Sequence, residues 1–170
     1  MKVLQWKQQD FSGRKYSVVS PEGQLGKLVF KGWSSYSAIF GSGDTSISFS
    51  SKGWLEQEVT IRYNGEVIGS AVTSVFGKTR IEMVSGERYL LESKSFSQKQ
   101  VLSDEAGKSI MSFEQSAFGF GKGKVLVADN VPELTRLLLL STGLYFKAVT
   151  DSQVALMVAI FIPVFMQIMR

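Results

Sequence analysis

Residues 154–162 read Val-Ala-Leu-Met-Val-Ala-Ile-Phe-Ile, and every one of them is apolar. A helix built from this stretch has no polar face, so it needs protein or lipid on all sides. Pro163 follows directly and removes one backbone donor, which predicts a kink in the last turns. Where this segment lies is therefore the main question that the sequence raises.

A second helical segment precedes the apolar one. Asn130 is a good N-cap residue, Glu133 follows three residues later, and Pro132 lies between them, which is typical of a helix start. The helix is expected to run to about Ala148 and to be partly amphipathic, with Glu133, Arg136 and Lys147 near one stripe. Thr150-Asp151-Ser152 offers a new capping cluster. The tail thus predicts two helices, at 129–150 and 151–170.

The residues before the tail have a different composition. Fifteen of the sixteen glycines precede Ala128, and only Gly143 follows it. The tail holds three basic and three acidic residues, so the net charge of +4 belongs to the first part. A glycine-punctuated, β-branched first part followed by a Leu-, Met- and Phe-rich tail indicates a change of secondary structure at about residue 128.

The first part is predicted to be antiparallel β-structure. In Leu55–Tyr63, apolar and polar residues alternate as in a strand with one buried face. Asn64-Gly65 after it is the strongest short hairpin signal, because a type I′ turn needs two residues that tolerate positive φ. Ser85-Gly86 and Asp104–Gly107 mark two further hairpins at a spacing of about 20 residues. We expect ten to twelve strands over 1–128, closed into a barrel because an open sheet would expose its edges.

The apolar helix has two possible environments, the interior of the barrel and a lipid bilayer. A barrel of about twelve strands is too wide to be filled by its own side chains, and one apolar helix along the axis would fill it. We therefore expect a single domain over 1–170, a mainly β closed barrel around the helix of 151–170. The alternative is a bilayer, which the two tail segments would enter as a helical hairpin. Val154–Met169 spans about 24 Å, short of the roughly 30 Å hydrocarbon core.

This arrangement resembles the tubby-like barrel superfamily, which includes the tubby C-terminal domain, the phospholipid scramblases and the LURP-one-related proteins. The resemblance rests on the hairpins at Asn64-Gly65, Ser85-Gly86 and Asp104–Gly107, on Val125-Leu-Val-Ala-Asp-Asn-Val-Pro132 and on the apolar tail. It implies a barrel around a central hydrophobic helix and, for tubby-type members, binding of a membrane surface. The second helix departs from the pattern, since family members typically have one. The first, more amphipathic segment would then cap the barrel, or the last segment would be a membrane addition. No family motif carries ligand residues over to this chain.

Composition excludes several chemistries. The sequence has neither cysteine nor histidine, which rules out a disulfide scaffold, a Cys/His zinc site and a Ser-His-Asp triad. We expect no catalytic residues, no metal and no cofactor, and therefore no enzyme. An enzyme acting on a lipid or a carbohydrate through carboxylates and Ser or Tyr side chains is the remaining catalytic alternative. The N-terminal residues lack the apolar stretch of a secretory signal, so we expect a cytoplasmic protein, associated with a membrane if the tail reaches one.

The net charge of +4 and the pI near 9.3 favour an anionic partner. Gly119–Lys124 combines glycines and lysines but lacks the helix that a phosphate loop needs, and we interpret it as a hairpin. Phe118 and Phe120 in a strand are explained by core packing, so no nucleic acid is expected. The candidate contacts to an anionic phospholipid are the basic residues that flank glycines or share strand faces, namely Lys27, Lys31, Lys78, Arg80, Lys122 and Lys124. The sequence thus predicts a non-enzymatic barrel that binds anionic phospholipid or a membrane surface. The alternative is a β-domain anchored by a helical hairpin.

Overall fold

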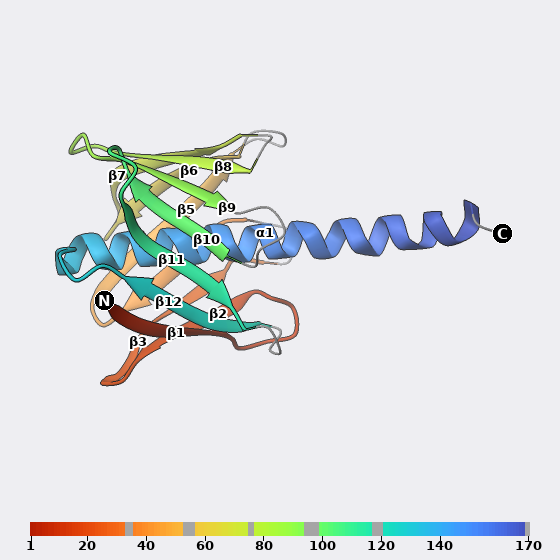
Figure 1. Cartoon of the computed structure of the whole chain (residues 1–170), viewed down its shortest axis with the longest axis horizontal. Helices are drawn as coiled ribbons and strands as arrows, with labels where there is room; N and C mark the ends of the chain where they lie inside the picture. Colours follow the sequence, from red (N-terminus) through yellow and green to blue (C-terminus); the bar gives the residue numbers. More distant parts are fainter. Residues whose placement is uncertain (33–35, 53–56, 75–76, 94–98, 117–120, 169–170) are drawn as a thin grey trace.

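The protein is a closed antiparallel β-barrel with one helix running through it (Figure 1). The computed structural model describes residues 1–32, 36–52, 57–74, 77–93, 99–116 and 121–168. The strands are β1 (Lys2–Gln8), β2 (Lys15–Ser20), β3 (Gly23–Phe30), β4 (Ala38–Ser42), β5 (Thr45–Lys52), β6 (Gln57–Tyr63), β7 (Glu66–Thr73), β8 (Lys78–Met83), β9 (Arg88–Ser93), β10 (Lys99–Asp104), β11 (Ser109–Gln115) and β12 (Lys122–Val127), and the helix is α1 (Glu133–Ile168).

The strands follow one another around the barrel in chain order. Each pairs with the next, and β1 closes the ring by pairing with β12, from Lys2 opposite Val127 to Lys7 opposite Lys122. The predicted closed barrel of about twelve strands is confirmed. The predicted hairpins are confirmed too: Asn64 and Gly65 both have positive φ, at 47° and 92°, between β6 and β7. Glycine and asparagine are the residues that reach this region at low cost.

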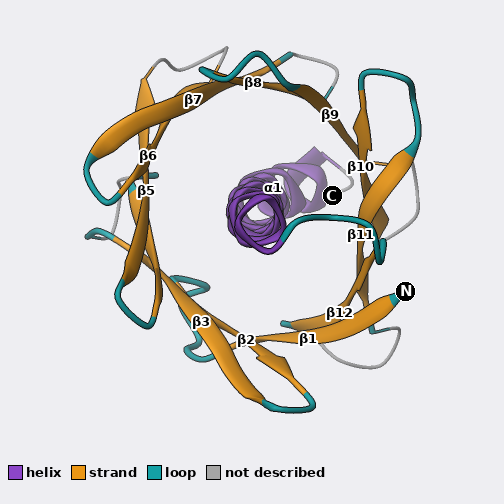
Figure 2. Cartoon of the chain, turned by 90° about the vertical axis from the view of Figure 1, so that its left-hand side faces the viewer, coloured by secondary structure: helices purple, strands orange, loops and turns teal. Residues whose placement is uncertain are grey.

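Because the strands simply go up and down, the loops alternate between the two ends of the barrel. We call the end at which α1 begins the entry end; it carries the hairpin turns after β2, β4, β6, β8 and β10. Figure 2 looks into the barrel from this end, with α1 inside the ring of strands. We call the opposite end the exit end; it carries the loops after β1, β3, β5, β7, β9 and β11. The helix leaves the barrel at the exit end (Figure 1).

The part of α1 that fills the barrel is its first half. Every residue from Leu139 to Val149 is buried, whereas Thr150, Gln153 and Met166 are exposed. The prediction that the segment of 151–170 fills the barrel is therefore wrong. The reason is length: strands of five to eight residues, tilted as barrel strands are, build a wall roughly 15–20 Å high. A 36-residue helix is about 54 Å long, so most of its second half lies beyond the wall.

The two helices predicted for the tail are one continuous helix. Its first main-chain hydrogen bond runs from the Arg136 N–H to the Pro132 carbonyl, so the helix starts two residues later than an Asn130 cap would place it. Asp151 does not cap a new helix. Its carboxylate accepts from the ammonium of Lys147, one turn earlier in the same helix. In the part of α1 whose side chains are described, we find no helix long and apolar enough to cross a membrane.

Aromatic contacts hold the first half of α1 in place. The Tyr145 ring stacks on Phe49 and Phe30, with ring centroids 4.6 and 5.7 Å away. Its hydroxyl donates a 2.7 Å hydrogen bond to the main-chain carbonyl of Tyr36. All three rings are buried. A buried tyrosine hydroxyl needs such an acceptor, so this bond fixes both the rotation and the depth of the helix.

Candidate functional site

The exit end of the barrel is basic. We count the described charged residues in its loops and in the two strand residues on either side of each loop. Eight are basic and four are acidic. The basic residues are Lys7, Arg14, Lys15, Lys31, Lys52, Lys78, Lys99 and Lys122, and the acidic ones are Asp10, Glu58, Glu92 and Glu114. Positive charge therefore surrounds the point where α1 leaves the barrel.

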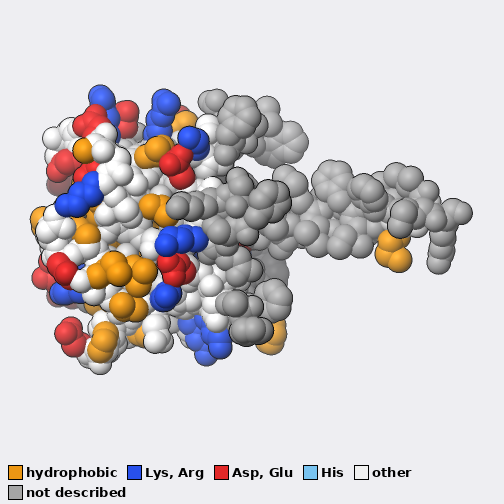
Figure 3. Space-filling model, in the orientation of Figure 1, with side chains coloured by type: hydrophobic (Ala, Val, Ile, Leu, Met, Phe, Trp, Pro, Cys, Tyr) orange, Lys and Arg blue, Asp and Glu red, His pale blue; other side chains and the backbone are white. Residues whose placement is uncertain are grey.

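The entry end has the reverse balance. Counted in the same way over its described residues, from Lys2 through Asp129, it has four basic and eight acidic side chains. The basic ones are Lys2, Arg62, Arg88 and Lys108, and the acidic ones are Glu22, Asp44, Glu66, Glu82, Glu87, Asp104, Glu105 and Asp129. Figure 3 shows basic and acidic side chains on one face of the barrel wall. The protein is thus polarised along the barrel axis, and an anionic surface would attract the exit end and repel the entry end.

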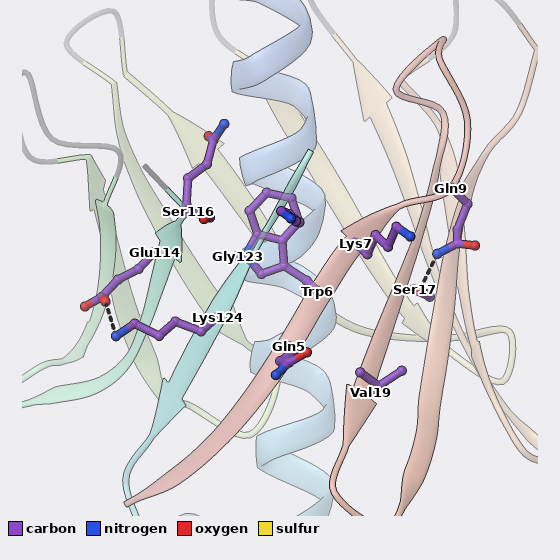
Figure 4. A pocket seen from close by; sticks show the side chains of 12 residues that line it. Gln5, Trp6, Lys7, Gln9, Ser17, Val19, Glu114, Ser116, Gly123 and Lys124 are labelled. Carbon is purple, nitrogen blue, oxygen red and sulfur yellow. Dashed lines mark hydrogen bonds and ion pairs between the residues drawn. The ribbon is translucent and has the colours of Figure 1, made fainter. Parts of the chain in front are cut away.

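A groove of about 570 Å³ runs over the outside of the wall toward the exit end, across β2, β1, β12 and β11 (Figure 4). Its floor includes Gly123, and the Trp6 ring lies behind that residue, inside the barrel. A Cβ on Gly123 would lie 2.7 Å from the Trp6 indole nitrogen, so the Trp6 ring packs directly against the Gly123 backbone. Most of the residues that line the groove are polar, among them Gln5, Lys7, Gln9, Ser17, Glu114, Ser116, Lys122 and Lys124.

Two lysines of this groove occupy paired positions on neighbouring strands. Lys7 and Lys122 are directly opposite in the β1–β12 ladder, both are exposed, and neither has an acidic partner among the described residues. Like charges in this position repel each other. By contrast, Lys124 pairs with Glu114 at 3.1 Å, and the same carboxylate binds Lys99 at 2.8 Å. These two lysines hold the pKa of Glu114 below its usual value. An anion bound between Lys7 and Lys122 would relieve their repulsion.

A buried lysine forms an ion pair with a partly exposed aspartate at the exit end. Lys147 on α1 is 4% exposed, and its Nζ lies 2.7 Å from both carboxylate oxygens of Asp151 and 3.1 Å from Oε1 of Gln115. The ammonium also lies 5.4 Å from the centre of the Trp6 ring. Beside this group, burial raises the pKa of Tyr16, and the Asp151 charge adds to the effect. All three donors of Lys147 therefore have partners without water.

The six lysines and arginines predicted as lipid contacts do not form one site. Lys31, Lys78 and Lys122 lie at the exit end, whereas Lys27, Arg80 and Lys124 lie further along their strands, toward the middle of the wall. Lys78 and Arg80 line a groove of about 520 Å³ with Glu82, and Lys78 pairs with Glu92 at 2.7 Å. Lys78 and Arg80 lie far from Lys27 and Lys31 around the barrel, because β3 and β8 are separated by four strands on the shorter way. Gly119, Phe118 and Phe120 lie outside the described residues.

Sequence reasoning missed several exit-end residues, among them Lys7, Lys15, Lys52 and Lys99. They lie far apart in the chain and carry no motif. A signal was nevertheless present: in an up-and-down meander, every second loop belongs to the same end. Sorting the charges by alternate loops would have revealed the polarity.

No family model, curated protein or solved structure was found to match this chain. The resemblance to tubby-like barrels therefore stays a prediction. The barrel itself is the class of architecture that the structure defines, and any functional conclusion has to come from the geometry of the exit end.

Proposed function

We propose that this protein is a non-enzymatic barrel that binds anionic membrane surfaces with its exit end. The single observation that carries the proposal is that α1 leaves the barrel at the basic end (Figure 1). The sequence of the part beyond the wall includes the wholly apolar run 154–162. Basic side chains around an apolar segment are the combination that membrane-surface proteins use, because one binds head groups and the other enters the acyl region.

The rest of the molecule is consistent with docking by this end. The acidic entry end would be repelled by anionic lipid, so the charge distribution favours one orientation. The groove beside Lys7 and Lys122 offers a place for a phosphate group between two lysines. The resemblance to tubby-like barrels implies membrane-surface binding as well. Since the cytoplasmic leaflet carries the anionic lipids, we assign the protein to that surface.

The membrane-anchored alternative is limited by the position of the first half of α1. A helical hairpin in the bilayer would need residues 137–149, but Leu139–Val149 are buried inside the barrel. Only the segment after Gln153 is available to lipid. At 1.5 Å per residue, residues 154–168 extend about 22 Å, so the insertion we propose is shallower than a full span.

The test is flotation of the full chain with vesicles of phosphatidylcholine alone and with vesicles that also contain phosphatidylserine. We expect binding to the anionic vesicles, weakened by salt. Neutralising Lys7 and Lys122 (K7Q/K122Q) should weaken it at least tenfold, given about 1 kcal/mol for each basic residue near the surface. The matched control is K2Q/K108Q, which removes two charges from the entry end and should bind like the wild type. Equal binding to neutral vesicles in high salt, or equal loss in both variants, would refute the proposal.

A further inference from the structure

We infer that the β1–β2 loop, residues 9–14, is a second membrane contact that places the ring of Phe11 in the interfacial layer of an anionic bilayer beside α1. This inference rests on the proposed function and adds a specific point of insertion to it.

Phe11 has the highest exposure of any large apolar side chain that the structure describes, at 109% of its reference area. A single exposed valine or leucine on a protein surface needs no explanation. A phenylalanine that packs against nothing is different, because its ring could cover neighbouring apolar atoms and gain about 1.5–3 kcal/mol by doing so.

Hydrogen bonds within the β1–β2 loop hold the Phe11 ring away from the barrel surface. The Asp10 carboxylate accepts hydrogen bonds from the main-chain N–H groups of Arg14 and Lys15, both at 3.0 Å, and from the hydroxyl of Ser12. The Gln9 N–H bonds the Lys15 carbonyl at 2.7 Å and closes the base of the loop. Gly13 takes the left-handed conformation, with φ of 66°. These hydrogen bonds and the Gly13 conformation fix the shape of the turn, so Phe11 is held at a defined position.

Basic side chains surround this turn. Lys15 is exposed directly after the loop, and Lys7 is exposed just before it. The Arg14 guanidinium lies 5.0 Å from the centre of the Phe30 ring and donates to the main-chain carbonyls of Lys31 and Gly32. This contact ties the β1–β2 loop to the next loop of the exit end. An aromatic ring with basic side chains around it suits the boundary between head groups and acyl chains, because the cations attract anionic head groups and the ring enters the interfacial layer.

The loop and α1 point in the same direction. In Figure 1 the β1–β2 loop, drawn in red-orange, extends past the barrel wall on the side where the helix leaves. The exposed aliphatic residues Val67 and Val84 lie instead in hairpins of the acidic entry end. A membrane that receives the second half of α1 would therefore meet Phe11 and not these valines.

The absence of cysteine from the sequence allows a clean experiment. A single cysteine is placed at Phe11 (F11C) and, as a matched control, at Val84 (V84C), and each full-length variant carries the polarity-sensitive fluorophore NBD. On phosphatidylserine-containing vesicles, NBD at position 11 should brighten, shift to the blue and be quenched by a spin-labelled lipid. NBD at position 84 should do none of these. Bound protein with an unchanged signal at position 11 would overturn the inference and leave the proposed function standing.

Two variants without a fluorophore test whether the label itself affects binding. The variant F11S should bind anionic vesicles roughly five- to tenfold more weakly than the wild type, and V84S should bind equally well. Equal affinity for F11S and V84S would contradict insertion of the ring. Failure of the wild type itself to bind anionic vesicles would refute the proposed function, and this inference with it.

Discussion

The backbone of Gly143 in α1 lies directly against the ring of Phe113 in β11. A Cβ built on Gly143 would be 2.2 Å from two carbons of that ring, a distance that real side chains do not reach. Both residues are buried inside the barrel. The only glycine of the tail thus lies where the helix backbone packs directly against the wall.

Replacing Gly143 with alanine is expected to destabilise the protein by about 1–3 kcal/mol, because the Phe113 ring has to move within a packed core. This loss outweighs the gain of about 1 kcal/mol that alanine brings to a helix interior. Urea denaturation followed by circular dichroism measures the difference. The control is G41A in β4, where a Cβ meets nothing within 4 Å; a G143A variant as stable as G41A would contradict the contact.

The two partners of the Lys147–Asp151 ion pair should respond differently to mutation. Asp151→Ala leaves the Lys147 ammonium buried with one amide and one ring, and should cost about 1–3 kcal/mol. Lys147→Met keeps the volume and leaves a carboxylate whose side chain is 39% exposed, so it should cost less, at most about 1 kcal/mol. Chemical denaturation of both variants tests this order. The reverse order would mean that Lys147 is hydrated in solution.

Truncation should separate the two halves of α1. A chain of residues 1–153 keeps the continuous buried run Leu139–Val149 and Asp151, so it should fold into the same barrel with nearly the same melting temperature. A chain of residues 1–143 lacks Leu144, Tyr145 and Phe146, each worth roughly 1.5–3 kcal/mol of burial, and should not fold. Circular dichroism and size-exclusion chromatography distinguish these results. An unfolded 1–153 chain would show that the second half of α1 supports the barrel.

Stability should fall in acid partly through Glu114. Its pKa is held below the usual value by Lys99 and Lys124, so it binds a proton less readily in the folded than in the unfolded state. Its contribution is therefore complete above the unfolded-state pKa and is lost as the pH falls through the folded-state pKa. The stability difference between the wild type and E114Q should shrink from pH 6 to pH 3, measured by urea denaturation. A difference that stays constant with pH would contradict this linkage.

The hairpins were predictable because their signals are local. Asn64 and Gly65 need no distant partner to favour positive φ, and alternation in Leu55–Tyr63 needs only the pleat of one strand. The number of strands and their closure follow from these turns. The position of the helix does not follow in the same way. Arg136 and Lys147 made the first half of α1 look partly solvent-exposed, yet Lys147 finds its partners in Asp151, Gln115 and Trp6, one of them on its own helix and two on the wall.

The basic end was harder to recognise than the barrel. Lys7 and Lys122 are 115 positions apart in the chain and become neighbours only because β1 pairs with β12. Phe11 looks in the sequence like any apolar residue before a strand, and only the folded loop shows that it packs on nothing. Both features depend on which loops share an end of the barrel.

From its sequence alone, this chain specifies a glycine-marked meander closed into a barrel and a helical tail, because turn chemistry and side-chain alternation act over a few residues. The tertiary structure decided which part of the helix lies inside and which charges gather at one end. These depend on the height of the wall, on a close contact such as that of Gly143 with Phe113, and on a strand pairing that joins the two ends of the sheet. A sequence pattern can assign the loops to alternate ends, but it does not give such distances between residues far apart in the chain.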